Sequence, residues 1–224
     1  MPALLPSNEE QRLAALRRYR LLDTSPEVGF DEVTQLAAML CETPIALMSL
    51  VDENRQWFKA RVGLDATETP RNLAFCAHAI LGQHVFVVED ASVDPRFADN
   101  PLVCTDPNIR FYAGAPLVSR EGMALGTLCV IDRKPRRMST YQMNALKLLS
   151  RQITVSMELR RTANDLATAL DQVRTMQALL PMCAWCKNVR DDKGQWHSVE
   201  QFLAKQSGTR TSHGICPACT AKHD

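Results

Sequence analysis

The sequence predicts an α+β fold, in which helices flank an antiparallel sheet and are followed by a long helix and a small cysteine-rich module. Three observations lead to this prediction. Short apolar runs separated by turn residues fill the first 132 positions, residues 139–180 contain neither Gly nor Pro, and two C-x-x-C pairs lie near the end. We therefore expect an N-terminal tail over residues 1–10, a mixed domain over 11–160, a helical connector over 161–180 and a cysteine-rich module over 181–224.

Composition restricts the class of protein. Hydrophobic residues make up 46% of the 224 residues, charged residues 23%, and the formal net charge is +1. These values predict a packed core and give no general argument for binding nucleic acid or an anionic membrane. No run of eighteen apolar residues and no secretory signal is seen, so we expect a cytoplasmic protein with reduced thiols and no membrane partner.

The first elements follow from apolar spacing. Residues 8–22 predict a helix, because Leu13, Leu16 and Tyr19 recur at helical spacing between charged residues. Residues 30–40 predict a second helix. The apolar run 45–51 then predicts a buried strand, and the polar turn at 52–55 returns the chain as a hairpin strand over 56–61.

The rest of the domain is predicted in the same way. Residues 74–81 are compatible with a short helix, and 84–88, 110–118 and 124–132 read as strands. Pro116 has no N–H to donate, so it belongs at a sheet edge or a bulge. Small residues in the last strand, such as Gly126, allow close approach of a neighbouring backbone.

The stretch 139–180 predicts one long helix. Ser139 or Thr140 can cap its first turn, and Pro181 ends it. We expect its first half to pack on the preceding domain. In the second half a thin apolar stripe, formed by Leu166, Leu170, Val173 and Leu180, predicts a short coiled coil and hence a homodimer. The alternative is a helix that packs only within its own chain.

Several blocks in the first domain carry a family resemblance. They are LDT at 22–24, PIA at 44–46, SLVD at 49–52, RQWFK at 55–59, ETPR at 68–71, FCAH at 75–78, FYAGAPL at 111–117 and GTLCVID at 126–132. In this order they resemble a GAF domain of the bacterial sensor type, over residues 11–160. The resemblance implies a six-stranded antiparallel sheet with helices on one side, a small-ligand pocket on the other, and a role in signal sensing.

The resemblance also implies which residues line that pocket. They are Cys76, His78, Asp90, Arg96, Phe97, Phe111 and Tyr112. Aromatic rings can enclose a ligand and Arg96 can pair with an anion. The alternative is that these residues only pack, and that the domain is a dimerising scaffold. Bilin attachment is less well matched because Ala77 separates the cysteine from the histidine, and the cyclic-nucleotide GAF signature is absent.

A second hypothesis is enzymatic. Some GAF proteins reduce free methionine sulfoxide with cysteines, and Cys76, Cys104 and Cys129 are available for thiol chemistry. Such a reductase needs an exposed thiol of low pKa. The spacing of these cysteines does not match what we expect of that family. We therefore predict no catalytic residue and keep the reductase as the alternative.

The C-terminal cysteines carry the most specific chemistry. Cys183, Cys186, Cys216 and Cys219 form two C-x-x-C pairs, which supply four thiolates at the corners of a tetrahedral Zn²⁺ site. A redox dithiol or four unligated cysteines are the alternatives, and His197 or His213 can replace a thiolate. The module also resembles a C-terminal cysteine module that follows sensor domains in bacterial signalling proteins.

The charge of this module bears on its partner. Residues 181–224 contain six Lys and Arg against four Asp and Glu, and four zinc-bound thiolates offset that excess. A near-neutral module is a poor match for a phosphate backbone, so we expect no nucleic-acid partner. The combined hypothesis is a GAF sensor coupled through a dimerising helix to a zinc-bound head that binds a signalling protein.

Overall fold

The computed structural model describes residues 3–177, 181–208, 212 and 214–215. The chain divides into two compact units, Met1–Asn164 and Asp165–Asp224. Each unit is described by itself.

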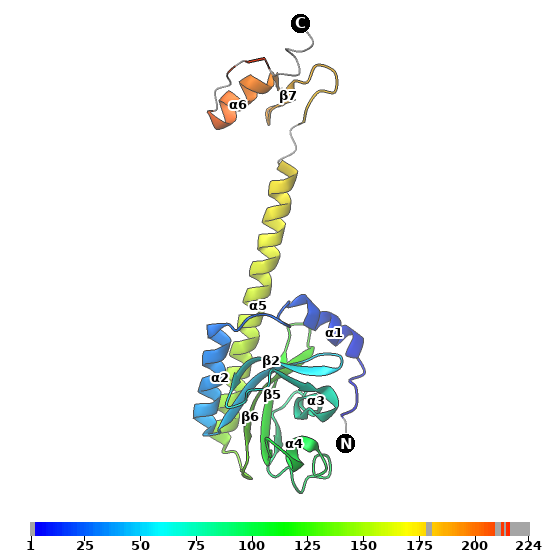
Figure 1. The fold of residues 1–224 in the computed structure, drawn as a ribbon, viewed down its shortest axis with the longest axis vertical. Coiled ribbons are helices and arrows are strands. Elements are labelled where there is room, and N and C mark those ends of the chain that lie inside the picture. The colour runs from blue at the N-terminus through cyan, green and yellow to red at the C-terminus, as the bar shows by residue number, and fades with distance from the viewer. Residues whose placement is uncertain (1–2, 178–180, 209–211, 213, 216–224) are drawn as a thin grey trace. The chain divides into compact units, whose positions relative to one another are not determined.

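The first unit is built on one six-stranded antiparallel sheet (Figure 1). Its strand order is β3-β2-β1-β6-β5-β4, so the strands predicted from the apolar runs 45–51 and 124–132 lie side by side at its centre. The strands are β1 Ile45–Val51, β2 Arg55–Val62, β3 Glu68–Pro70, β4 Phe86–Val88, β5 Phe111–Val118 and β6 Ala124–Asp132. This confirms the predicted fold class. The sequence prediction did not include β3, because Glu68, Thr69 and Pro70 carry no strand pattern.

Helices cover both faces of the sheet (Figure 1). They are α1 Glu9–Arg18, α2 Val28–Cys41, η1 Arg71–Leu73, α3 Phe75–Ala79, α4 Pro101–Cys104 and α5 Thr140–Gln177. Apolar residues of α1, α2 and α5 form one core with one face of the sheet. α3, α4 and the loops around them form a second core on the other face. The small helices on that second face were expected only in part, because runs of four or five residues carry little periodicity.

The long helix α5 begins with a capping box. The Ser139 hydroxyl accepts a hydrogen bond from the Gln142 N–H, and the Gln142 side chain accepts one from the Ser139 N–H. Ile153 is fully buried in the core, so the first half of the helix packs on its own domain as predicted. Leu148 and Leu159 on the same helix are 62% and 71% exposed.

Two small details of the sheet follow the sequence prediction. Pro116 pairs with β6 on one side, and in residues 3–177 the β4 partner on its other side reaches only positions 112–114. The proline therefore lies at an open edge. Gly126 lies against the β1 backbone, where a Cβ atom would come within 1.9 Å of the Ser49 carbonyl oxygen. Only glycine allows this close approach of the two central strands.

The second unit contains a short hairpin and a helix. β7 Val189–Arg190 pairs with β8 Trp196–His197, and α6 spans Val199–Ser207. The DDKG turn at 191–194 and the cap residue Ser198 predict this hairpin and helix from the sequence, and Ser198 and Gln201 form a capping box at the start of α6. Among the described residues of this unit, Val189 and Phe202 are the buried apolar side chains, so its core is small.

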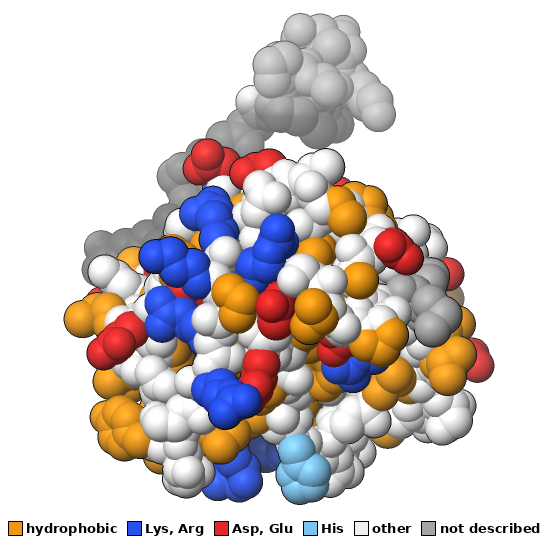
Figure 2. Space-filling model, turned by 90° about the horizontal axis from the view of Figure 1, so that it is seen from below, with side chains coloured by type: hydrophobic (Ala, Val, Ile, Leu, Met, Phe, Trp, Pro, Cys, Tyr) orange, Lys and Arg blue, Asp and Glu red, His pale blue; other side chains and the backbone are white. Residues whose placement is uncertain are grey.

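The surface mixes charges of both signs. Figure 2 shows one face of the molecule, where Lys and Arg side chains are interspersed with Asp, Glu and apolar groups. This distribution fits the net charge of +1. None of the described helices contains an apolar stretch that is long enough to cross a bilayer.

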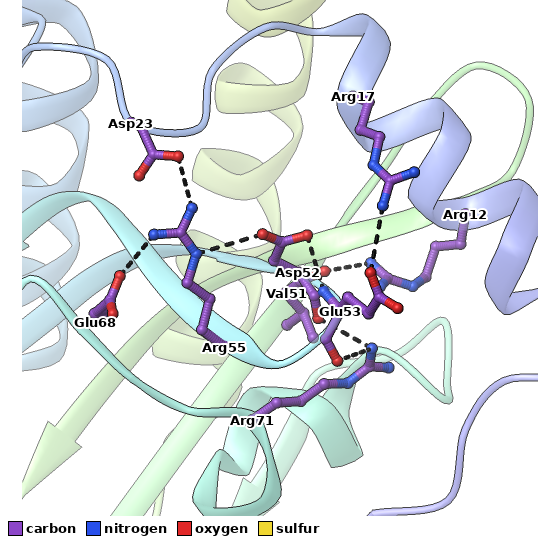
Figure 3. A network of polar contacts seen from close by, with 9 residues as sticks. All are labelled: Arg12, Arg17, Asp23, Val51, Asp52, Glu53, Arg55, Glu68 and Arg71. Atoms are coloured by element: carbon purple, nitrogen blue, oxygen red, sulfur yellow. Dashed lines mark hydrogen bonds and ion pairs between the residues drawn. The ribbon is translucent and has the colours of Figure 1, made fainter.

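An arginine hub fixes the turn between β1 and β2 (Figure 3). The Arg55 guanidinium contacts the carboxylates of Asp23 at 2.6 Å, Glu68 at 2.7 Å and Asp52 at 3.4 Å. These three partners come from the loop after α1, from β3 and from the hairpin turn. The hub therefore joins segments that are distant in sequence.

A second group in the same view ties α1 to this hairpin (Figure 3). Arg12 is 1% exposed and donates to the Val51 carbonyl oxygen at 2.7 Å, while Arg71 donates to the Asp52 carbonyl oxygen at 3.0 Å. Both guanidinium groups also contact the Glu9 carboxylate. Burial alone raises the pKa of Glu9, but the two arginines outweigh burial and lower that pKa from 4.5 to about 2.

This arrangement predicts an acid-dependent loss of stability. The pKa of Glu9 is lower in the folded than in the unfolded chain, so its ion pairs stabilise the fold above pH 4.5 and are lost as the pH falls through about 2. Replacing Glu9 with Gln should lower the free energy of unfolding at neutral pH and flatten its dependence on pH over this window. Urea denaturation at several pH values measures both effects. Glu10→Gln, an exposed neighbour, is the matched control, and equal behaviour of the two variants would contradict the prediction.

Candidate functional site

A cavity of about 170 Å³ lies on the face of the sheet that carries α3 and α4. Side chains from β1, β2, α3, β5, β6 and the 101–109 segment line it, and most of them are apolar: Ile45, Leu47, Phe58, Leu64, Phe75, Leu102, Ile109 and Ile131. Apolar cavities of about 150 Å³ hold a molecule the size of benzene. The resemblance implied a pocket on this side of the sheet.

One polar group in the cavity wall lacks a partner. Gln56 is 5% exposed, and its Nε2 group makes a long contact of 3.4 Å to the Thr69 hydroxyl. Its Oε1 atom accepts no hydrogen bond from any described residue. An unpaired buried acceptor costs free energy, and in native proteins it is usually satisfied by another group. A ligand that carries a hydrogen-bond donor would satisfy it.

A sulfur-centred group forms another part of the wall. The Cys76 thiol lies 3.9 Å from the Cys129 sulfur. The hydroxyls of Thr127 and Tyr112 donate to the Cys76 sulfur at 3.0 and 3.2 Å. Cys76 and Tyr112 both line the cavity. Gly114 leaves room for this arrangement, because a Cβ atom there would lie 2.2 Å from the Tyr112 hydroxyl.

These contacts shift the pKa values of the two thiols in opposite directions. Burial alone raises the pKa of Cys76, but hydrogen bonds from Cys129, Thr127 and Tyr112 stabilise the thiolate and lower the pKa to about 7. Burial and the adjacent Cys76 raise the pKa of Cys129 well above its usual value. Burial raises the pKa of the Tyr112 hydroxyl, and the two nearby sulfurs raise it further. Cys76 is therefore the more readily ionised thiol.

Three predicted pocket residues, His78, Arg96 and Phe97, do not line the cavity. They contact one another and neighbouring aromatic rings beside it. The ring of Phe97 stacks on Phe75 with centroids 4.0 Å apart, and His78 meets Phe97 edge-on at 4.8 Å. The Arg96 guanidinium lies 4.8 Å from the Phe86 ring and pairs with Asp94 at 2.6 Å. Arg96 thus already has an anionic partner.

Two further predicted residues lie away from the cavity. Phe111 is 1% exposed, but it packs in the core on the opposite face of the sheet. Adjacent strand residues point to opposite faces, so Phe111 and Tyr112 cannot both face the same cavity. Asp90 accepts hydrogen bonds from the backbone N–H and the hydroxyl of Ser92, which places it in a turn. Of the seven predicted residues, the structure brings only Cys76 and Tyr112 to the cavity wall.

The sequence prediction did not include Gln56, Leu47 or Phe58, which also line the cavity. β2 does not alternate between polar and apolar residues, so no sequence pattern indicates which of its side chains face inward. The third cysteine of the reductase hypothesis, Cys104, is exposed and does not line the cavity.

The first C-x-x-C pair occupies a tight turn in the second unit. The Cys183 backbone N–H donates to the Asn188 carbonyl oxygen, and the Cys183 carbonyl oxygen accepts a hydrogen bond from the Lys187 N–H. The Cys186 N–H donates to the Cys183 sulfur at 3.5 Å. Lys187 adopts a positive φ of 60°. His197, an alternative ligand, contacts Asp191 at 2.7 Å. Cys216, Cys219 and His213 lie outside the described residues, and the described residues alone contain no group of three metal-binding side chains.

Comparison with the sequences of known proteins adds two findings. A family model described as GAF domain matches residues 25–157. A cyclic di-GMP phosphodiesterase of Pseudomonas aeruginosa is 53% identical over 131 residues, which cover 58% of this chain and 22% of the phosphodiesterase. The matched segment therefore spans about a fifth of that relative's length.

Two solved structures share the fold. The GAF domain of an Acinetobacter phosphoenolpyruvate-protein phosphotransferase has a TM-score of 0.50 at 19% identity, and covers 69% of this chain and 98% of its own. A free methionine-R-sulfoxide reductase from Neisseria meningitidis, solved with its substrate, has a TM-score of 0.51 at 17% identity, with 73% and 99% covered. At these identities the likeness concerns the fold alone.

Proposed function

This chain belongs to the GAF domain family, and on that premise we propose that it is a signal-sensing protein whose cavity binds a small, mainly apolar ligand. The relative named a cyclic di-GMP phosphodiesterase supports a signalling or sensor role. We propose a regulatory role for this chain and not a catalytic one. Cys76 is 1% exposed and faces a mostly apolar cavity, which does not suit the ammonium and carboxylate groups of free methionine sulfoxide, the substrate of the reductase alternative.

The unpaired Oε1 atom of Gln56 is the observation that carries the ligand proposal. The cavity is otherwise mostly apolar, so burial of an apolar body supplies affinity and one hydrogen bond supplies orientation. A flat molecule of about one ring with a single donor fits this combination. Phenol has both properties, whereas benzene has the ring without the donor, and the two serve as matched probes.

Replacing Gln56 with Met tests the proposal, because two effects of opposite sign are expected. The free protein should become more stable, since the variant removes a buried unpaired acceptor that costs about 1–3 kcal/mol. Phenol should bind roughly fivefold more weakly, since one hydrogen bond contributes about 1 kcal/mol, while benzene binding should not weaken. Thermal denaturation measures the first effect and NMR titration the second.

Gln152→Met is the matched control, because Gln152 is exposed on α5 and does not line the cavity. It should alter neither stability nor the preference for phenol over benzene. If neither probe binds the wild-type protein, or if Q56M keeps the phenol preference, Gln56 does not orient a cavity ligand. Native mass spectrometry of the protein as purified would in addition reveal any ligand that remains bound.

We propose that the output of this sensor runs through α5. Its exposed apolar residues are spaced seven, four and three apart: Tyr141, Leu148, Val155, Leu159, Leu166, Leu170 and Val173. Such spacing suits the seam of a parallel two-stranded coiled coil, with Leu159, Leu166 and Val173 at one seam position. We therefore propose a homodimer in which a change at the cavity alters the pairing of the two helices.

The C-terminal module completes the proposal. Cys183, Cys186, Cys216 and Cys219 would hold one structural Zn²⁺ through thiolates. The turn that contains the first two cysteines supports the zinc proposal. The exposed indole of Trp185, which lies between them in the sequence, offers an apolar contact to a protein partner. The zinc-bound head would then present the state of the dimer to a signalling protein.

A further inference from the structure

Two buried thiols face each other across the sulfur-centred group. Cys76 lies in α3 and is 1% exposed, Cys129 lies in β6 and is 0% exposed, and their sulfur atoms are 3.9 Å apart. A disulfide bond measures about 2.05 Å, so the sulfurs need to approach by about 2 Å to become bonded. Cys76 lies in a helix of only five residues.

We propose that Cys76 is a peroxide-reactive thiol and that Cys129 resolves it, so that a small hydroperoxide converts the pair into a disulfide. In the first step the Cys76 thiolate attacks a peroxide oxygen. A sulfur–oxygen bond forms, the oxygen–oxygen bond breaks, and the leaving hydroxide takes up a proton. In the second step the Cys129 sulfur attacks the sulfenic acid, the disulfide forms, and the hydroxyl leaves as water with the Cys129 proton. Two thiols are oxidised and one peroxide is reduced.

The contacts of Cys76 favour it as the attacking thiol. The hydroxyls of Thr127 and Tyr112 donate to its sulfur, and such donors stabilise the thiolate, which is the reactive form. Cys76 also lines the cavity, and this gives a molecule as small as hydrogen peroxide a route to a sulfur that the outer surface covers. Cys41 provides the contrast, because burial raises the pKa of its thiol to about 11.

Disulfide formation has a consequence for the cavity. Bonding to β6 would draw Cys76 away from its present position in the wall, so the oxidised protein should bind phenol more weakly. This consequence rests on the proposed ligand site, whereas the disulfide itself does not. Failure of the phenol experiment would therefore leave the thiol proposal open to its own test.

The test treats the full-length protein with hydrogen peroxide at neutral pH, blocks the remaining thiols and maps peptides by mass spectrometry. The expected product is one peptide pair that joins Cys76 to Cys129 and is lighter by two hydrogens, while Cys41 stays reduced. In Cys129→Ala, Cys76 should instead accumulate sulfenic acid, which a cyclic 1,3-dione captures. Thr127→Val should slow the reaction roughly tenfold, because it removes one donor to the thiolate.

Two internal comparisons make the result decisive. Exposed Cys104 reports that peroxide has reacted, and the rate at Cys76 should rise with pH and level off above about 7. The proposal is wrong if Cys104 is oxidised while Cys76 and Cys129 both remain alkylatable. It is equally wrong if Cys76 forms its disulfide with another cysteine.

Discussion

The purified full-length protein is expected to carry one zinc ion per chain, and a chelator should remove the ion and unfold residues 181–224. Four thiolates hold structural zinc with apparent free energies of about 10–16 kcal/mol at neutral pH. In the described part of this unit, Val189 and Phe202 are the buried apolar side chains. Such a small core cannot replace that free energy, so metal loss should equal loss of folding.

Elemental analysis measures the metal, and circular dichroism together with tryptophan fluorescence measures the unfolding. Trp185 and Trp196 report on the module, whereas Trp57 lies in the core of the GAF domain and should be unaffected. Cys183→Ser should lose the zinc, and Cys104→Ser, a change at an exposed cysteine of the GAF domain, should retain it. A wild-type protein that is free of metal and still folded over residues 181–224 would exclude the zinc head.

Replacing Leu166 with Glu is expected to convert the proposed homodimer into a monomer. The side chain of Leu166 is 59% exposed, and it falls seven residues after Leu159 and seven before Val173. In a coiled coil this position is buried in both helices, and each buried leucine contributes about 1.5–3 kcal/mol. Losing both copies should therefore weaken the dimer by at least about a hundredfold.

Sedimentation equilibrium of the full-length chain measures the dissociation constant. Ala167→Glu is the matched control, because it adds the same charge one position along the helix, outside the seam. It should leave the dissociation constant nearly unchanged. If wild type is monomeric at all concentrations tested, or if both variants weaken association equally, the stripe on α5 is not the dimer interface.

Local sequence signals were sufficient for most of the fold. The apolar runs at 45–51 and 124–132 predicted β1 and β6, and the uninterrupted stretch from Ser139 predicted α5 with its cap. The turn at Asp191 and the cap at Ser198 predicted the hairpin and helix of the second unit. These features depend on residues only a few positions apart, so their periodicity and capping chemistry are readable from the sequence.

The candidate site depended on contacts that only the tertiary structure decides. Strand side chains alternate between faces, so a register difference of one residue placed Tyr112 at the cavity and Phe111 in the opposite core. Cys76 and Cys129 are 53 residues apart, and no local pattern predicts that α3 brings their sulfurs together. The sequence by itself determined most of the elements, their order and the family blocks. Packing of the two faces decided which side chains enclose the cavity, because that depends on segments that meet only after the chain has folded.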